Sequence, residues 1–172
     1  MARLTAVADR VLRKPMRPFA TTWSLLLAVP LLACATHRIP GTQIPDTSDT
    51  RAIVAAIEAY RLAAEHRDAG AVMALVSPHY YDNAGTPDPS DDVDYALLRA
   101  RLSDDYQKIT ALRLDINVKQ VDVMGDRAAA YVDYDEYYRI ATKAGEVAKQ
   151  ASDTHRMQFA REDHVWHFVS GL

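Results

Sequence analysis

The spacing of apolar residues changes partway along the chain, and this change restricts the fold more than any other feature of the sequence. Between residues 50 and 106, apolar side chains recur every three or four positions, as they do on one face of a helix. From Leu112 onwards they alternate with polar residues, which is the period of a strand with one buried face. Helices followed by strands predict an α+β domain, with three N-terminal helices packed on a mostly antiparallel sheet.

Each of the three expected helices has a recognisable boundary. The first begins at Asp49 or Thr50 and runs to about residue 66, and the second is short and is closed by Pro78. The third follows a cap at Ser90 or Asp91. The apolar face of the first helix is expected to consist of Ile53, Ile57, Tyr60 and Ala64.

The expected strands are long, and the first of them is bent. Its apolar residues alternate up to Val118 and resume out of phase at Val121, so we predict a β-bulge near Lys119 and Gln120. Residues 124–127 form a tight turn. The next strand turns one face outward, towards solvent or a partner, and that face carries Tyr131, Asp133, Asp135 and Tyr137. The inward positions of the last two strands are His155, Met157, Phe159, Trp166 and Phe168.

An apolar run of about ten residues, Trp23 to Leu32, precedes the domain and ends next to Cys34, the only cysteine. This run is half of the roughly 20 residues that a membrane-spanning helix needs. Basic residues precede it and small residues flank the cysteine, which indicates a secretory signal peptide over residues 1–34. A second interpretation is a free thiol at the end of an uncleaved anchor. A start at Met16 instead of Met1 would give a leader of more usual length.

The ending Leu31-Leu32-Ala33-Cys34 resembles the lipobox of bacterial lipoproteins. This resemblance implies that Cys34 is lipidated and becomes the first residue of the mature chain, anchored in the bacterial cell envelope. Ala35 follows it, where an Asp would direct enteric lipoproteins to the inner membrane. The resemblance therefore favours the outer membrane, with the domain facing the periplasm.

The composition beyond the leader excludes several classes of function. Residues 35–172 hold 15 Lys and Arg against 22 Asp and Glu, a net charge of −7, so we expect no nucleic-acid binding. They contain no cysteine and no histidine spacing typical of zinc, so neither a metal nor a cofactor is expected. Residues 35–49 are rich in proline and small polar residues and are predicted to form a flexible tether that buries nothing, which leaves 50–172 as the domain.

The order of elements resembles the nuclear transport factor 2-like superfamily. The matching motifs are a Gly-Asp turn before an alanine-rich strand, in residues 121–128, and Trp166 near the end of the chain, in residues 165–170. The resemblance covers about residues 50–172 and implies a cone (cystatin-like), in which a strongly curved sheet wraps a long helix and leaves a pocket at its open end. The superfamily includes ketosteroid isomerases, polyketide cyclases, dehydratases, epoxide hydrolases and members without known chemistry, so the fold does not fix the function.

Two residues are candidates for acid–base catalysis. Asp82 follows the second helix, near the place where isomerase-like members carry a general base, although the Pro-Gly usual after that acid is replaced by residues 83–85. The alternative is an Asx turn that orders the loop. His155 is a candidate of the kind that dehydratase-like members use, or else a hydrogen-bonded core residue. No second acid is evident on the sheet.

Aromatic residues with a polar tip suit a pocket that stacks a ring and donates one hydrogen bond. We expect a ligand site built from Tyr60, Tyr80, Tyr81, Tyr95 and Trp166, although Tyr60 and Tyr95 fit the core equally well and Trp166 fits it better. The predicted function is a non-enzymatic, lipid-anchored domain that binds a small apolar ligand or a protein partner. The alternatives are an isomerase, cyclase or dehydratase using Asp82 or His155 beside Tyr60, and a homodimer formed through the outward sheet face.

Overall fold

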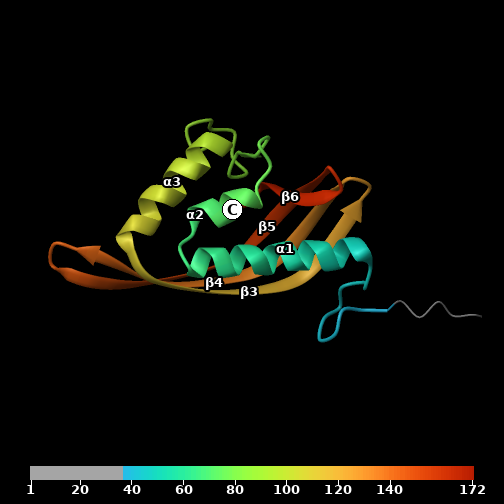
Figure 1. Cartoon of the computed structure of the whole chain (residues 1–172), viewed down its shortest axis with the longest axis horizontal. Coiled ribbons are helices and arrows are strands. Elements are labelled where there is room, and N and C mark those ends of the chain that lie inside the picture. The colour runs from blue at the N-terminus through green and yellow to red at the C-terminus, as the bar shows by residue number, and fades with distance from the viewer. Residues whose placement is uncertain (1–36) are drawn as a thin grey trace, which may run out of the picture. The chain divides into compact units, whose positions relative to one another are not determined.

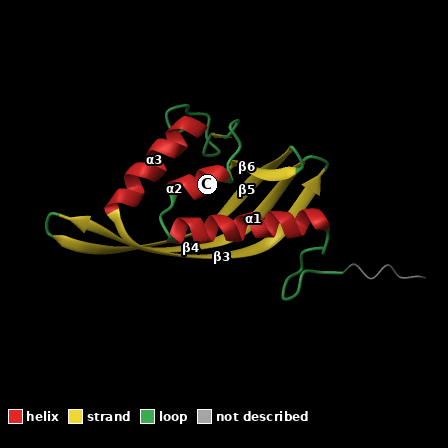
Figure 2. Ribbon diagram, in the orientation of Figure 1, coloured by secondary structure: helices red, strands yellow, loops and turns green. Residues whose placement is uncertain are grey.

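The computed structural model describes residues 37–172, and the leader with Cys34 lies outside them. Three helices come first, followed by the long strands (Figures 1 and 2). The helices are α1 (Ser48–Glu65), α2 (Ala69–Ala74) and α3 (Tyr95–Lys108). The long strands are β3 (Ile109–Met124), β4 (Arg127–Thr142) and β5 (Gly145–Glu162), and the shorter β6 (Val165–Ser170) follows them. The short strands β1 (Tyr81–Asp82) and β2 (Val93–Asp94) pair with each other before α3. The predicted α+β class is confirmed.

Strands β3 to β6 form one antiparallel, curved sheet in the order β3-β4-β5-β6 (Figure 2). The register shifts between Val118 and Gln120, where the change of phase predicted a bulge. A second shift, between Ile109 and Ala111, was not expected. Strand β6 is short and pairs with β5 only from Gln158 onwards. The hairpin of β4 and β5 therefore extends beyond the helices (Figure 1).

Helix α1 lies along the concave face of the sheet (Figure 1). Its predicted apolar face is confirmed, because Ile53, Ile57, Tyr60 and Ala64 are all buried. Opposite them the alternating residues of the strands are buried as well: Leu114, Val121, Ala128, Ala130, Val132, Met157, Phe159 and Phe168. The matching of one helical stripe to one sheet face is what makes a single core.

The end of α1 is attached to β3 through polar contacts. Glu65 Oε1 accepts a hydrogen bond from the Leu114 amide at 3.0 Å, and the Arg67 guanidinium donates to the Ile109 carbonyl at 2.7 Å. These contacts fix the direction in which α1 crosses the sheet. None of the described helices is long and apolar enough to cross a membrane.

The helix caps differ from those expected. Helix α1 is capped by Thr47, whose hydroxyl accepts from the Thr50 amide at 3.1 Å, while the Thr50 hydroxyl accepts from the Thr47 amide at 3.0 Å. This reciprocal capping box moves the start of the helix ahead of Asp49. Helix α3 is capped by Asp94 and not by the expected Ser90 or Asp91. Val93 and Asp94 form strand β2, so the helix can begin only after them.

Part of the segment predicted to be a tether is ordered against the domain. A tight turn at Gly41, with φ of +79°, brings the Ile39 amide to the Ile44 carbonyl at 2.9 Å. The turn directs Ile44 into the core, where it is only 1% exposed. The prediction that residues 35–49 bury nothing is therefore wrong at Ile44, because proline and glycine here build a turn rather than a flexible linker.

Candidate functional site

A cavity of about 310 Å³ opens on the concave side of the sheet, between α1, β4, β5 and the last two residues. Its lining is Tyr60, Tyr134, Glu136, Ala151, Ser152, Asp153, His155, Met157, Gly171 and Leu172. Strand periodicity explains the contributions of β4, because Tyr134 and Glu136 are two residues apart and so share its inward face. Pairing of Tyr134 with Asp153 and of Val132 with His155 brings β5 to the same place.

Aromatic rings form the walls of this cavity. The rings of Tyr134 and His155 are stacked, with their centroids 4.8 Å apart. Tyr60, from α1, is buried and packs against the ring of Phe168 at 5.7 Å. Burial raises the pKa of Tyr60 well above its usual value, and the neighbouring Tyr134 hydroxyl raises it further. Burial also raises the pKa of Tyr134, so Tyr60 and Tyr134 both stay neutral at physiological pH. Each offers a ligand an apolar ring surface and one hydroxyl group.

Glu136 is a charged residue in the middle of β4, on the face that lines the cavity, and it is half-buried. Within residues 37–172 no side chain or backbone group donates a hydrogen bond to its carboxylate, and no cation pairs with it within 4.0 Å. Burial raises its pKa, and the charge of Asp105 on α3 raises it further. Its charge in turn contributes to the raised pKa values of Tyr106 and Tyr134, behind the larger effect of their own burial.

Glu136 therefore shares the cavity with Tyr60 of α1 and Tyr134 of β4. No second acid on the sheet was predicted from the sequence to accompany Asp82, whereas in the structure Glu136 lines the cavity on the concave face. The signal was present, because the inward alternation that contains Tyr134 reaches Glu136 next. A charged residue in the buried phase of a strand is the feature that should have been singled out.

Glu136→Gln is expected to stabilise the protein slightly at pH 7, by less than about 0.5 kcal/mol, because it removes a charge that partial burial disfavours and that water still screens. The pKa of Glu136 is raised above 4.5 in the folded state, so its stabilising contribution is complete at low pH and is lost as the pH rises through the folded pKa. The gain should therefore disappear below about pH 4. Urea unfolding at both pH values measures this, with the exposed Glu146→Gln on the same hairpin as control. Equal effects of the two substitutions would contradict the assignment.

Asp82 does not line the cavity that contains Tyr60 and His155. One of its carboxylate oxygens accepts from the Ala84 amide at 2.9 Å, which is the Asx turn considered as the alternative. The other accepts from the Gly171 amide at 2.6 Å and from the Tyr80 hydroxyl at 3.4 Å. The structure thus places His155 and Tyr60 in one cavity. Asp82 instead binds the backbone amides of its own loop and of the C-terminal segment.

The five aromatic residues predicted to form one ligand site are divided among different places, and only Tyr60 lines the cavity. Tyr80 is buried, donates to the Leu172 carbonyl at 3.3 Å and has its pKa raised to about 12 by burial. Tyr81 is 55% exposed and bonds to Asp92. Trp166 is buried in the core.

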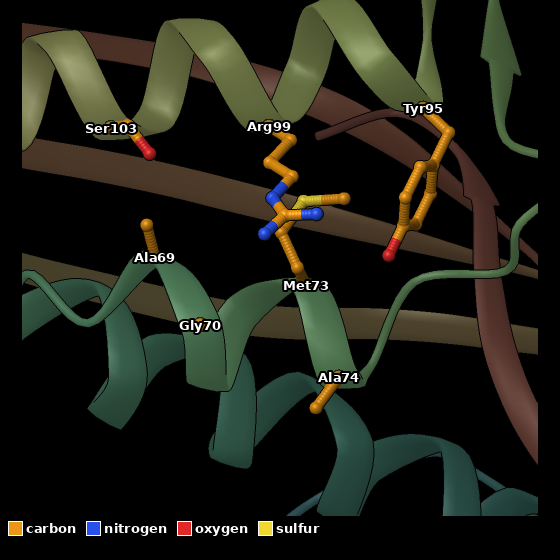
Figure 3. Close-up of a pocket in the computed structure, with 7 residues that line it drawn as sticks. All are labelled: Ala69, Gly70, Met73, Ala74, Tyr95, Arg99 and Ser103. Atoms are coloured by element: carbon orange, nitrogen blue, oxygen red, sulfur yellow. The ribbon is translucent and has the colours of Figure 1, made fainter.

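Tyr95 belongs to a separate groove between α2 and α3 (Figure 3). There Arg99 reaches from α3 towards α2 over Met73, and the Tyr95 ring points to the same side. The groove has a volume of about 380 Å³ but lacks the aromatic walls and the carboxylate of the cavity on the sheet. We therefore take the cavity, and not this groove, as the candidate functional site.

The outward sheet face, predicted as a dimer surface, carries contacts within the chain. The Arg156 guanidinium lies 6.0 Å from the centre of the Tyr131 ring, and Lys119 pairs with Asp133 at 2.6 Å. Dimerisation through this face stays a prediction. Among residues 37–172 there is no group of three side chains suited to hold a metal ion.

No protein-family model matches this sequence, and no curated protein matches it significantly. Solved structures do match. A ketosteroid isomerase-like protein from Erwinia carotovora atroseptica aligns with a TM-score of 0.58 at 18% identity, over 73% of this chain and 95% of its own. A candidate dehydratase of the NTF2-like family from Streptomyces avermitilis gives 0.57 at 15% identity, over 72% and 93%.

A third structure, a candidate scytalone dehydratase from Novosphingobium aromaticivorans, aligns with a TM-score of 0.62 at 12% identity, over 72% of this chain and 80% of its own. Identities this low concern the fold alone. The predicted resemblance to the nuclear transport factor 2-like superfamily is confirmed at that level: the chain has its helices on a curved, mostly antiparallel sheet. Proteins of this fold include isomerases, dehydratases and non-enzymes.

Proposed function

We propose that this protein is a lipid-anchored domain of the bacterial cell envelope that binds a small, ring-containing molecule in the cavity between α1, β4 and β5, without catalysis. The observation that carries the proposal is the aromatic wall, in which Tyr60 and the stacked pair of Tyr134 and His155 face one cavity. Flat rings with hydroxyl tips bind flat apolar ligands and orient them with few hydrogen bonds. The cavity volume of about 310 Å³ corresponds to a small ligand.

The contacts of Asp82 support the non-catalytic form of the proposal. Both of its oxygens accept hydrogen bonds from the backbone, from Ala84 and from Gly171, and this acid does not reach the cavity. A general base must lie within hydrogen-bond reach of the proton that it removes.

A second candidate function is proton transfer of the isomerase or dehydratase type. Glu136 and His155 favour it, because they line the same cavity and burial raises the pKa of Glu136. In this alternative Glu136 replaces Asp82 as the base. Conversion of a bound compound, abolished by Glu136→Gln, would favour catalysis over binding alone.

Binding in the cavity is tested with N-phenyl-1-naphthylamine, a neutral probe that fluoresces in apolar surroundings. We expect saturable fluorescence with the full chain and a loss of affinity of at least tenfold in Ala151→Phe. Ala151 lines the cavity and is paired with Glu136 on the adjacent strand, so a phenylalanine there would fill part of the cavity. Ala148→Phe is the matched control, since Ala148 is an exposed alanine of the same strand, outside the cavity. Fluorescence that never saturates, or that Ala151→Phe leaves unchanged, would contradict the proposal.

Attachment to the membrane is proposed from the lipobox-like ending at Cys34. Each buried CH₂ of an acyl chain contributes about 0.8 kcal/mol, so a multiply acylated terminus holds firmly. Cys34→Ser should move the protein from the membrane fraction to the soluble fraction and abolish labelling by an alkyne fatty acid in a bacterial host. Ala35→Ser is the control and should retain the label. Labelling that persists in Cys34→Ser would overturn the proposed anchor.

A further inference from the structure

The cavity on the concave face has a negative charge balance. Glu136 and Asp153 line it, and Asp105 of α3 lies close enough to Glu136 to raise its pKa. No lysine or arginine is among its lining residues, and His155 is the one basic group that lines it. Lys108 lines a neighbouring hollow that shares Glu136, but its ammonium pairs with Asp104.

The carboxylate of Glu136 accepts no hydrogen bond from any described residue, although the side chain is half-buried. A charge that is removed from water without a partner is unfavourable, and a ligand that supplies the partner recovers that free energy. The aromatic groups of the cavity also favour a cationic ligand. Tyr60, Tyr134 and His155 line the same cavity as Glu136, and the faces of aromatic rings attract cations.

We infer that the cavity selects a small molecule with an ammonium group on an apolar ring system, the ammonium group bound to Glu136 and the ring against Tyr60 and Tyr134. The inference rests on the proposed function and adds the charge of the ligand to it. An anionic ligand of the same shape would meet Glu136 and Asp153, with no lysine or arginine in the lining to offset them.

The experiment compares three probes that share one ring and differ in charge: 1-naphthylmethylamine, 1-naphthalenemethanol and 1-naphthoate. Each is titrated against the full chain loaded with N-phenyl-1-naphthylamine, and its displacement is recorded. We expect the amine to bind at least tenfold more tightly than the alcohol, and the carboxylate to bind most weakly. Because the pKa of Glu136 is raised, the advantage of the amine should shrink as the pH falls and Glu136 becomes protonated.

The matched pair of variants is Glu136→Gln and Asp135→Asn, neighbours on β4 with carboxylates on opposite faces. Glu136→Gln should abolish the preference for the amine over the alcohol, whereas Asp135→Asn should preserve that preference. Equal affinities of amine and alcohol, or an advantage that survives in Glu136→Gln, would overturn the ammonium inference alone. Absence of saturable binding by the neutral probe would overturn the proposed function, and the inference with it.

Discussion

Trp166→Ala is expected to lower the free energy of unfolding by about 3–5 kcal/mol. The Trp166 side chain is only 5% exposed, and it joins β6 to the first turn of α1. Its indole Nε1 donates to Asp49 at 3.3 Å, and the Arg161 guanidinium stacks on its ring at 4.6 Å. Arg161 itself pairs with Asp49 at 3.1 Å. Removing the indole therefore exposes this ion pair to solvent and leaves a cavity in the core.

Denaturation in urea measures the loss, and two variants divide it into its parts. Trp166→Phe keeps a ring but loses the hydrogen bond to Asp49, which corresponds to about 1 kcal/mol. Val165→Ala changes the adjacent residue, which is 54% exposed, and should cost less than about 1 kcal/mol. A cost of Trp166→Ala as small as that of Val165→Ala would contradict the described contact between β6 and α1.

Gly171→Ala is the second substitution with a large expected effect, about 2–4 kcal/mol, and it should also impair the cavity. Gly171 has φ of +90°, and an added Cβ would lie 2.3 Å from the Arg156 carbonyl oxygen and 2.9 Å from Met157 Cα. The backbone must move away from β5, so the hydrogen bond from the Gly171 amide to Asp82 at 2.6 Å is lost. Leu172, which lines the cavity beside Gly171, is displaced with it.

Gly85→Ala is the control for the backbone conformation alone. Gly85 also has a positive φ, of +71°, but no atom lies within 4 Å of its added Cβ. It should cost only about 1 kcal/mol and leave the binding of N-phenyl-1-naphthylamine intact. Urea unfolding and probe titration of both variants distinguish the cost of a positive φ from the cost of the steric clash with β5. Equal effects on stability and on probe binding would show that the approach of Gly171 to β5 is unimportant.

Periodicity in the sequence was sufficient for the architecture. The face of α1 that contains Ile53 and Ile57 is buried as predicted, and the phase change after Val118 marks a bulge. These features are local, since a stripe or an alternation is determined by neighbouring residues and the backbone geometry of one element. Boundaries were less predictable, because the capping box at Thr47 competes with the equally good cap at Asp49.

The candidate site depended on contacts that are distant in sequence. Tyr60 and Tyr81 are equally plausible ligand residues by composition, yet Tyr60 is buried beside a cavity and Tyr81 is exposed in the short strand β1. Asp82 is bound by Gly171, 89 residues later, and nothing near Asp82 in the sequence indicates this. Glu136 could have been found from the alternation of β4, but its partner in the cavity lining, Tyr60, comes from α1.

The central claim is that the cavity between α1, β4 and β5 is where this protein binds its ligand. Titration of the ¹⁵N-labelled full chain with 1-naphthylmethylamine, followed by amide chemical shifts, tests it most directly. The account predicts that saturable shifts concentrate at Tyr60, Tyr134, Glu136 and His155 and disappear in Ala151→Phe. Shifts confined to the groove between α2 and α3 around Tyr95 and Arg99, or to the outward sheet face, would contradict it.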